Sequence, residues 1–107
     1  GLYPSARKCG LDRGDRRSVT KDYRAVLDRP DVDAVCISTP DHWHGRMTLD
    51  ALAAGKDVYV EKPMTRTAEE AVAVVDAWRH TGRVVTVGVQ SMADGVWARA
   101  FDAIRTG

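Results

Sequence analysis

The sequence of 107 residues lacks the features that are typical of disulfide-rich, membrane-spanning and nucleic-acid-binding proteins. Its two cysteines, Cys9 and Cys36, have no Cys-x-x-Cys spacing, so a disulfide framework does not organise the chain. No apolar run approaches the roughly 18 residues that a membrane span needs. Sixteen basic and fifteen acidic side chains leave a formal charge of +1, which gives no footprint for nucleic acid. We therefore expect neither nucleic acid nor a membrane as a partner, and a cytoplasmic location.

The residues that are present suit one compact domain. Hydrophobic residues make up 44% of the chain and charged residues 29%, close to the globular average of about 25%. The sequence has no initiator Met, and it stops at Gly107 just after a helix-like segment. We expect a fragment of a longer polypeptide, in which an export signal would precede residue 1.

Hydrophobic periodicity after the mixed segment 1–17 predicts helices that alternate with strands. Strands are expected over 34–37, 58–60 and 84–89. Helices are expected over about 21–28, about 42–54, from Thr67 to Gly82, and over about 94–105. This order favours right-handed crossovers and a parallel sheet, so the fold class is α/β with a sheet of about three strands.

Local signals refine this prediction. Thr20 is expected to cap the first helix, and Thr67 with Glu70 forms a capping box. The apolar run 34–37 predicts a strand that is buried on both faces. Trp43 falls on the apolar stripe of the second helix and is expected to pack on the core. Charges at the amino-terminal edge of the sheet, Lys56 and Asp57 among them, are expected to be solvated.

Polar segments follow all three predicted strands. They are Ser38-Thr39-Pro40-Asp41, Glu61-Lys62-Pro63 and Gln90-Ser91. Ligands of open parallel sheets bind outside the carboxyl ends of the strands, so these segments would border one site. The alternative is ordinary loop polarity, because strand ends lie at the surface whatever the function. The start of the helix after the first strand, capped by Asp41 or Thr39, would favour an anion there.

Lys62 is the candidate catalytic residue. Pro63 restricts Lys62 to extended backbone and so fixes where its side chain starts. An amine at this edge could exchange a proton with a reacting hydroxyl or stabilise an oxyanion. The alternative is a solvated lysine that pairs loosely with Glu61 or Glu69.

Two histidines after the first strand, His42 and His44, suggest a metal site as an alternative, because imidazole is a common zinc ligand. In a helix, however, residues two apart point in different directions, and neither His80 nor the cysteines supply a partner at metal-site spacing. We therefore assign no metal ligand. One histidine is expected to bond to a bound ligand instead. The sequence also lacks a Gly-x-Gly-x-x-Gly loop and a strand that ends in a ribose-binding acid, so it does not encode a complete dinucleotide site.

Three motifs taken together resemble the Gfo/Idh/MocA oxidoreductase family. They are the Thr39-Pro40 element that ends at His44, the Ala-Gly-Lys-x-Val element at 54–58 that leads to Glu61-Lys62-Pro63, and Val87-Gly88-Val89-Gln90. The resemblance runs from about residue 20 to residue 107, whereas residues 1–19 match poorly. It implies that residues 20–107 are the later part of a Rossmann domain that binds NAD or NADP. The first strand, the glycine loop and the C-terminal substrate domain are absent.

The family resemblance also implies an activity and site residues. The family oxidises or reduces sugars, inositols and related polyols, and its C-terminal domain mediates oligomerisation, so the full-length protein would be a homo-oligomer. Lys62 would lie by the nicotinamide and the reacting hydroxyl. The other cofactor-binding positions would be Ser38, Thr39, Pro40, His44, Glu61, Pro63 and Gln90, and Pro63 is often cis in the family. Alone, the fragment is expected to be inactive. The rival hypotheses are a metal-dependent hydrolase that uses His42 and His44, and a non-catalytic Rossmann-type binding module.

Overall fold

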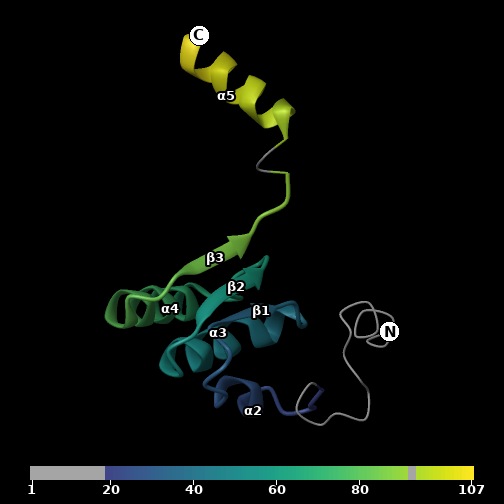
Figure 1. Ribbon diagram of the computed structural model, residues 1–107. Helices are drawn as coiled ribbons and strands as arrows, with labels where there is room; N and C mark the ends of the chain where they lie inside the picture. Colours follow the sequence, from purple (N-terminus) through teal and green to yellow (C-terminus); the bar gives the residue numbers. More distant parts are fainter. Residues whose placement is uncertain (1–18, 92–93) are drawn as a thin grey trace.

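The computed structural model of the protein describes residues 19–91 and 94–107 (Figure 1). Its elements alternate as the periodicity predicts. They are α2 (Arg24–Leu27), β1 (Ala34–Ile37), the 3-10 helix η1 (Asp41–Trp43), α3 (His44–Ala53), β2 (Asp57–Glu61), α4 (Ala68–Thr81), β3 (Val85–Gly88) and α5 (Gly95–Thr106).

The three strands form one parallel sheet in the order β1-β2-β3. Ile37 pairs with Val60 across β1 and β2, and Glu61 pairs with Gly88 across β2 and β3. The predicted α/β class is therefore confirmed. Because each strand runs in the same direction, the segments that follow the strands all leave the sheet at one edge (Figure 1).

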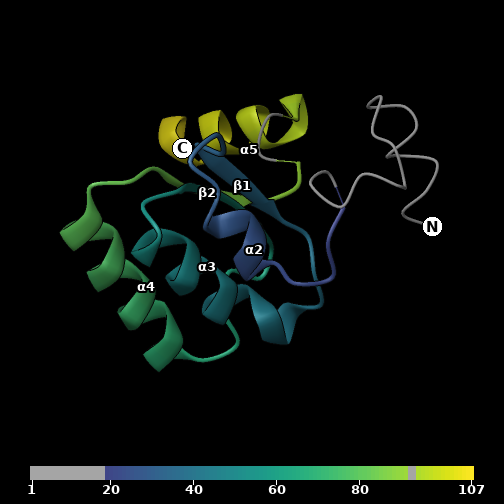
Figure 2. The ribbon, with the colours of Figure 1, turned by 60° about the horizontal axis from the view of Figure 1, so that its bottom comes forward.

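The core lies between one face of the sheet and helices α2, α3 and α4, which all lie on that face (Figure 2). Burial follows the pleat: on β2 the buried Val58 and Val60 alternate with the exposed Tyr59, and on β1 the exposed Ala34 and Cys36 alternate with the half-buried Val35 and the buried Ile37. The core cluster contains Leu27, Ile37, Ala51, Leu52, Val58 and Val60.

The opposite face of the sheet is open, which contradicts the prediction that β1 is buried on both faces. Ala34 and Cys36 are exposed, and Tyr59 on β2 and Thr86 on β3 lie exposed beside them. The apolar run indicated burial because all four residues of β1 are apolar or small. Among the described residues, however, the helices that contact the sheet do so from the other face.

The second predicted helix is divided into η1 and α3. Pro40 precedes η1 in an extended conformation, and none of the three residues of the 3-10 turn is buried. Trp43 is 45% exposed and does not pack on the core, contrary to the prediction. The buried side of α3 is formed by His44, Thr48, Ala51 and Leu52.

Helix boundaries follow the sequence signals in some places and not in others. Thr67 caps α4, because its Oγ1 accepts a hydrogen bond of 3.2 Å from the backbone N–H of Glu70. Gly82 ends α4 with a left-handed φ of 63°, which favours glycine. Thr20 does not cap α2. Its Oγ1 accepts from the N–H of Asp22, and α2 begins only at Arg24.

Two charged residues at the amino-terminal edge of the sheet, which were predicted to be solvated, make hydrogen bonds to the backbone instead. Lys56 is only 9% exposed, and its Nζ donates a 2.7 Å hydrogen bond to the carbonyl oxygen of Arg29. Asp57 Oδ1 accepts from the N–H of Val84 at 2.9 Å and so joins β2 to the start of β3. Within the described ranges, no helix is long and apolar enough to cross a membrane.

Candidate functional site

The carboxyl edge of the sheet gathers the three polar segments that the sequence analysis singled out. Residues 38–41 follow β1, residues 62 and 63 follow Glu61 at the end of β2, and Gln90 comes two residues after β3. We call this edge the rim. Parallel pairing of the strands confirms that the three segments share one edge, as predicted.

Lys62 is exposed at the centre of the rim, because β2 is the middle strand. Its backbone N–H donates to Glu61 Oε2 at 3.3 Å, and the Lys62–Pro63 peptide bond is cis, as the resemblance implied. In the described part of the chain, no carboxylate lies within 4.0 Å of the Lys62 ammonium group. The side chain is exposed to solvent, as the alternative of a solvated lysine expects, but the pairing with Glu61 or Glu69 in that alternative is not formed. The ammonium group therefore remains available to a ligand.

His44 is the most buried polar group at the rim, with 2% of its surface exposed. Its Nδ1 lies 2.7 Å from the carbonyl oxygen of Pro63, and its Nε2 lies 2.8 Å from the carbonyl oxygen of Thr39. Both ring nitrogens thus contact the chain itself. This arrangement leaves neither nitrogen free for a direct bond to a cofactor or a metal.

The remaining rim residues lie closer to solvent. Ser38, Pro40 and Gln90 are exposed. Thr39 is half-buried, and its Oγ1 donates to the sulfur of Met47 at 3.7 Å. The predicted side-chain cap is wrong, because neither Asp41 nor Thr39 caps η1 or α3 through a side-chain hydrogen bond.

The geometry gives no support to the metal alternative. His42 is exposed beside Asp41, with 3.8 Å between Nδ1 and a carboxylate oxygen, and its ring lies 5.8 Å from that of Trp43. His44 points to two carbonyl groups instead. Across residues 19–91 and 94–107, no group of three His, Cys, Asp or Glu residues could hold a metal ion.

The largest pKa shift among the described residues belongs to Asp31, which lies away from the rim before β1. The hydrogen bond from Arg29 lowers the pKa of Asp31 to about 2. Desolvation and the hydrogen bond to Asp50 raise the pKa of Tyr23. Burial opposes ionisation of Asp50, but hydrogen bonds from Tyr23 and Arg46 outweigh it and lower the pKa of that carboxyl. These residues form structural ion pairs and hydrogen bonds, so their shifts do not mark a catalytic centre.

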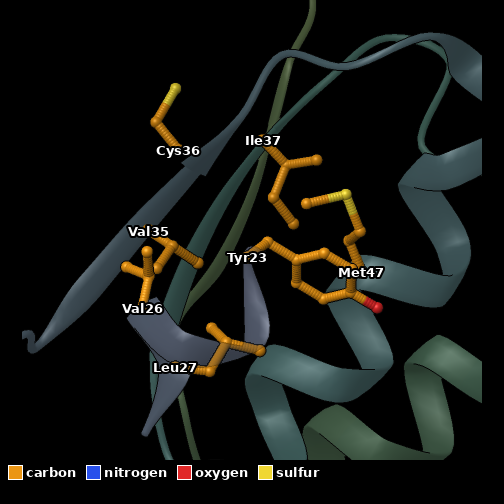
Figure 3. Close-up of a pocket in the computed structure, with 7 residues that line it drawn as sticks. All are labelled: Tyr23, Val26, Leu27, Val35, Cys36, Ile37 and Met47. Carbon is orange, nitrogen blue, oxygen red and sulfur yellow. The ribbon is translucent and has the colours of Figure 1, made fainter. Parts of the chain in front are cut away.

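An apolar pocket of about 170 Å³ lies between α2, α3 and β1 (Figure 3). Cys36 points away from the other labelled side chains (Figure 3). The Tyr23 hydroxyl already donates to Asp50 Oδ2 at 2.6 Å. The pocket therefore offers no reactive group, and the rim is the candidate functional site. The pocket is lined by Tyr23, Val26, Leu27, Val35, Cys36, Ile37 and Met47.

Sequence reasoning found the rim residues but missed the partners of His44. The backbone carbonyl groups of Thr39 and Pro63 carry no sequence signal, because every residue has one. Only the meeting of η1, α3 and the segment after β2 reveals their role.

Comparison with known proteins identifies the family of the chain. The family model described as "Oxidoreductase family, NAD-binding Rossmann fold", that of Gfo/Idh/MocA proteins, matches residues 5–89. The chain belongs to this family. Its sequence is 35% identical over 102 residues to scyllo-inositol 2-dehydrogenase (NAD(+)) of Bacillus subtilis, covering 95% of this chain and 28% of that protein.

Two further comparisons concern levoglucosan dehydrogenase. The protein of Pseudarthrobacter phenanthrenivorans is 40% identical over 73 residues, covering 68% of this chain and 17% of that protein. A solved levoglucosan dehydrogenase in complex with NADH and levoglucosan is 37% identical, with a TM-score of 0.67. That match covers 78% of this chain and 21% of the solved one. The chain thus spans less than a third of the length of these relatives.

Proposed function

We propose that this chain is the later part of the cofactor domain of an NAD- or NADP-dependent oxidoreductase that acts on a sugar, an inositol or a related polyol. The observation that carries the proposal is the exposed ammonium group of Lys62, which has no carboxylate partner among the described residues, at the centre of a parallel-sheet rim. The substrate class is supported by the relatives, because scyllo-inositol 2-dehydrogenase and levoglucosan dehydrogenase are named for a cyclic polyol and an anhydro sugar.

The groups at the rim fit the nicotinamide side of a dinucleotide. Hydroxyl, amide and backbone groups of Ser38, Thr39 and Gln90 supply donors and acceptors at the position where open sheets bind their ligands. Glu61 and Pro63 flank the ammonium group on β2 and after it. The sequence contains no glycine-rich phosphate loop, so the phosphate side of the cofactor needs residues from outside this chain.

Lys62 has the chemistry that a carbinol–carbonyl interconversion requires. A nicotinamide held at the rim would supply hydride transfer to or from the carbinol carbon. The hydroxyl proton must leave at the same centre during oxidation, and the amine of Lys62 would accept it; during reduction Lys62 would return it. An ammonium group in the same position would stabilise negative charge on the substrate oxygen. His44 is buried and both of its ring nitrogens contact backbone carbonyl groups, so it would not contact the reacting atoms itself.

Substitution of Lys62 tests the proposal in the full-length protein that contains this chain. We expect Lys62→Ala to lower kcat for NAD-linked oxidation by about 10²–10⁴-fold, the usual loss when an acid–base group is removed. Reduced nicotinamide is followed by absorbance with levoglucosan, scyllo-inositol, myo-inositol and glucose as substrates. Lys21→Ala is the matched control, because Lys21 is also an exposed lysine but lies near the start of the described residues, before α2.

The outcomes separate the proposal from its rivals. Unchanged turnover in Lys62→Ala would remove Lys62 from the reaction. Binding of NADH without turnover of any polyol would favour the non-catalytic binding module. Hydrolysis that depends on added zinc and is lost in His42→Ala would favour the hydrolase.

A further inference from the structure

His44 makes two hydrogen bonds that a neutral imidazole ring cannot make together. Both partners, the oxygens of Thr39 and Pro63, are backbone carbonyl groups, which only accept. A neutral ring carries one N–H and one lone pair, so one nitrogen would face a carbonyl oxygen at 2.7 or 2.8 Å with no hydrogen between them. Only a ring with a proton on each nitrogen satisfies both contacts.

The two carbonyl groups belong to two different segments of the rim. Thr39 comes two residues after β1, and Pro63 comes two residues after β2 and directly after Lys62. Among the described residues, no backbone hydrogen bond joins 38–43 to 62–67, because the ladder between these strands ends with the strands themselves. The buried ring is therefore the hydrogen-bonded link between the two segments.

Among the described residues, no carboxylate oxygen lies within 4.0 Å of the His44 ring nitrogens, so the two carbonyl oxygens are the groups that face a positive ring. The other charged and titratable residues of η1 and α3 are Asp41, His42, Arg46 and Asp50. Those at the end of β2, in the segment after it and in the first turn of α4 are Glu61, Lys62, Arg66, Glu69 and Glu70. Glu70 lies against the first turn of α3, since a Cβ built on Gly45 would be 3.4 Å from one of its carboxylate oxygens. A carboxylate is thus close to the residue that follows His44.

The geometry points to His44 as a positioning residue. A doubly protonated ring donates to the carbonyl groups of Thr39 and Pro63 and holds the segment that carries Lys62 against the segment after β1. This role rests on the proposed function, because it acts through the ammonium group of Lys62. Misplacement of a reacting group by about 1 Å can cost about 10²-fold in rate, so loss of the link should lower turnover without removal of any reacting group.

Nitrogen NMR of the ¹⁵N-labelled chain at neutral pH tests the protonation directly. We expect two slowly exchanging ring N–H signals from His44, because both N–H groups are buried and bonded. His42 and His80, which are exposed, serve as internal references. A single ring N–H on His44 would overturn the doubly protonated ring, whatever the activity of the protein.

A double-mutant cycle tests the positioning in the full-length protein. We expect His44→Leu, which cannot donate, to lower kcat by about 10²-fold, and His44→Gln, whose amide can still donate, to recover part of it. In the Lys62→Ala background, measured in single turnovers with excess enzyme, His44→Leu should change the rate by no more than about twofold. A cooperative urea-unfolding transition is required of each variant as evidence that it is folded. If His44→Leu does not fold, His44→Gln takes its place in the comparison.

The results distinguish this role from the proposed function. Equal losses for His44→Leu in both backgrounds, or no loss in either, would overturn the positioning role and leave Lys62 as the reacting group. Full activity of Lys62→Ala would instead overturn the proposed function, while the NMR result would still decide the protonation of the ring.

Discussion

At the residue scale, the side chain of Thr48 is buried at an energetic cost. It lies on the core side of α3 with none of its surface exposed, and its Oγ1 has no hydrogen-bond partner within residues 19–91 and 94–107. Burial of a hydroxyl without a partner costs about 1–3 kcal/mol in protein mutational data. Valine has the same branched shape and no polar atom, so it would fit the site without that cost.

We therefore expect Thr48→Val to raise the free energy of unfolding by about 1 kcal/mol, measured by urea denaturation. Thr81→Val on α4 is the control, because Thr81 Oγ1 donates at 2.9 Å to the carbonyl oxygen of Ala77 and has a bond to lose. A loss of stability in Thr48→Val similar to that in Thr81→Val would contradict the assignment of Thr48 as unsatisfied.

At the residue scale, the sequence predicts what local chemistry decides. Thr67 and Gly82 were found from their spacing, because a cap and a left-handed turn depend on neighbours a few residues away. The part played by His44 could not be found in this way. Its partners lie 5 and 19 residues away, and they meet it only after β1, α3 and β2 have packed together.

At the scale of elements, a hydrogen-bonded cluster joins the short helix α2 to α3. Tyr23, just before α2, donates its hydroxyl to Asp50 Oδ2 at 2.6 Å, and Arg46 Nε lies 3.0 Å from the other oxygen of that carboxylate. A helix of four residues is too short to be stable alone. Its position therefore depends on this cluster and on the burial of Leu27.

The lowered pKa of Asp50 makes this link sensitive to acid. A carboxyl whose pKa is lower in the folded state stabilises the fold above its unfolded pKa of about 3.9, and the contribution is lost as the pH falls through the folded pKa. We expect Tyr23→Phe to lower the free energy of unfolding by about 1–2 kcal/mol at pH 7, and by less below about pH 4.

Urea unfolding at several pH values measures this difference. Tyr59→Phe is the matched control, because the Tyr59 side chain is 45% exposed and its hydroxyl has no hydrogen-bond partner among the described residues. A difference between Tyr23→Phe and the unmodified chain that stayed constant down to pH 2 would show that the Asp50 carboxylate does not carry it.

The positions of the strands were predicted correctly, whereas the start of the second helix and the burial of β1 were not. The strands were found because short apolar runs lie between turn residues. The helix predicted over 42–54 begins instead with a 3-10 turn, since Pro40 lies extended beside it and Asp41 to Trp43 form a tighter turn before His44. Burial of β1 was overestimated because an apolar run does not reveal how many layers cover the sheet.

At the scale of the whole molecule, the sheet and helix α5 both carry exposed large apolar side chains. Tyr59 and Val84 lie exposed toward the open face or edge of the sheet. The amphipathic helix α5, drawn yellow, extends away from the sheet in Figure 1, with Phe101 and Ile104 exposed. In this arrangement one layer of helices covers one face of the sheet: α3 contacts β1 and β2, and α2 and α4 contact α3.

This arrangement predicts unequal effects for two large apolar residues. Leu52 is 1% exposed beneath the sheet, so Leu52→Ala should lower the free energy of unfolding by about 2–5 kcal/mol through lost burial and a cavity. Phe101 is 65% exposed, so Phe101→Ala should change it by no more than about 0.5 kcal/mol. Urea denaturation of both variants, followed by far-ultraviolet circular dichroism, gives the comparison. A cost for Phe101→Ala as large as that for Leu52→Ala would mean that α5 packs against an apolar surface in solution, because an exposed ring has no burial to lose.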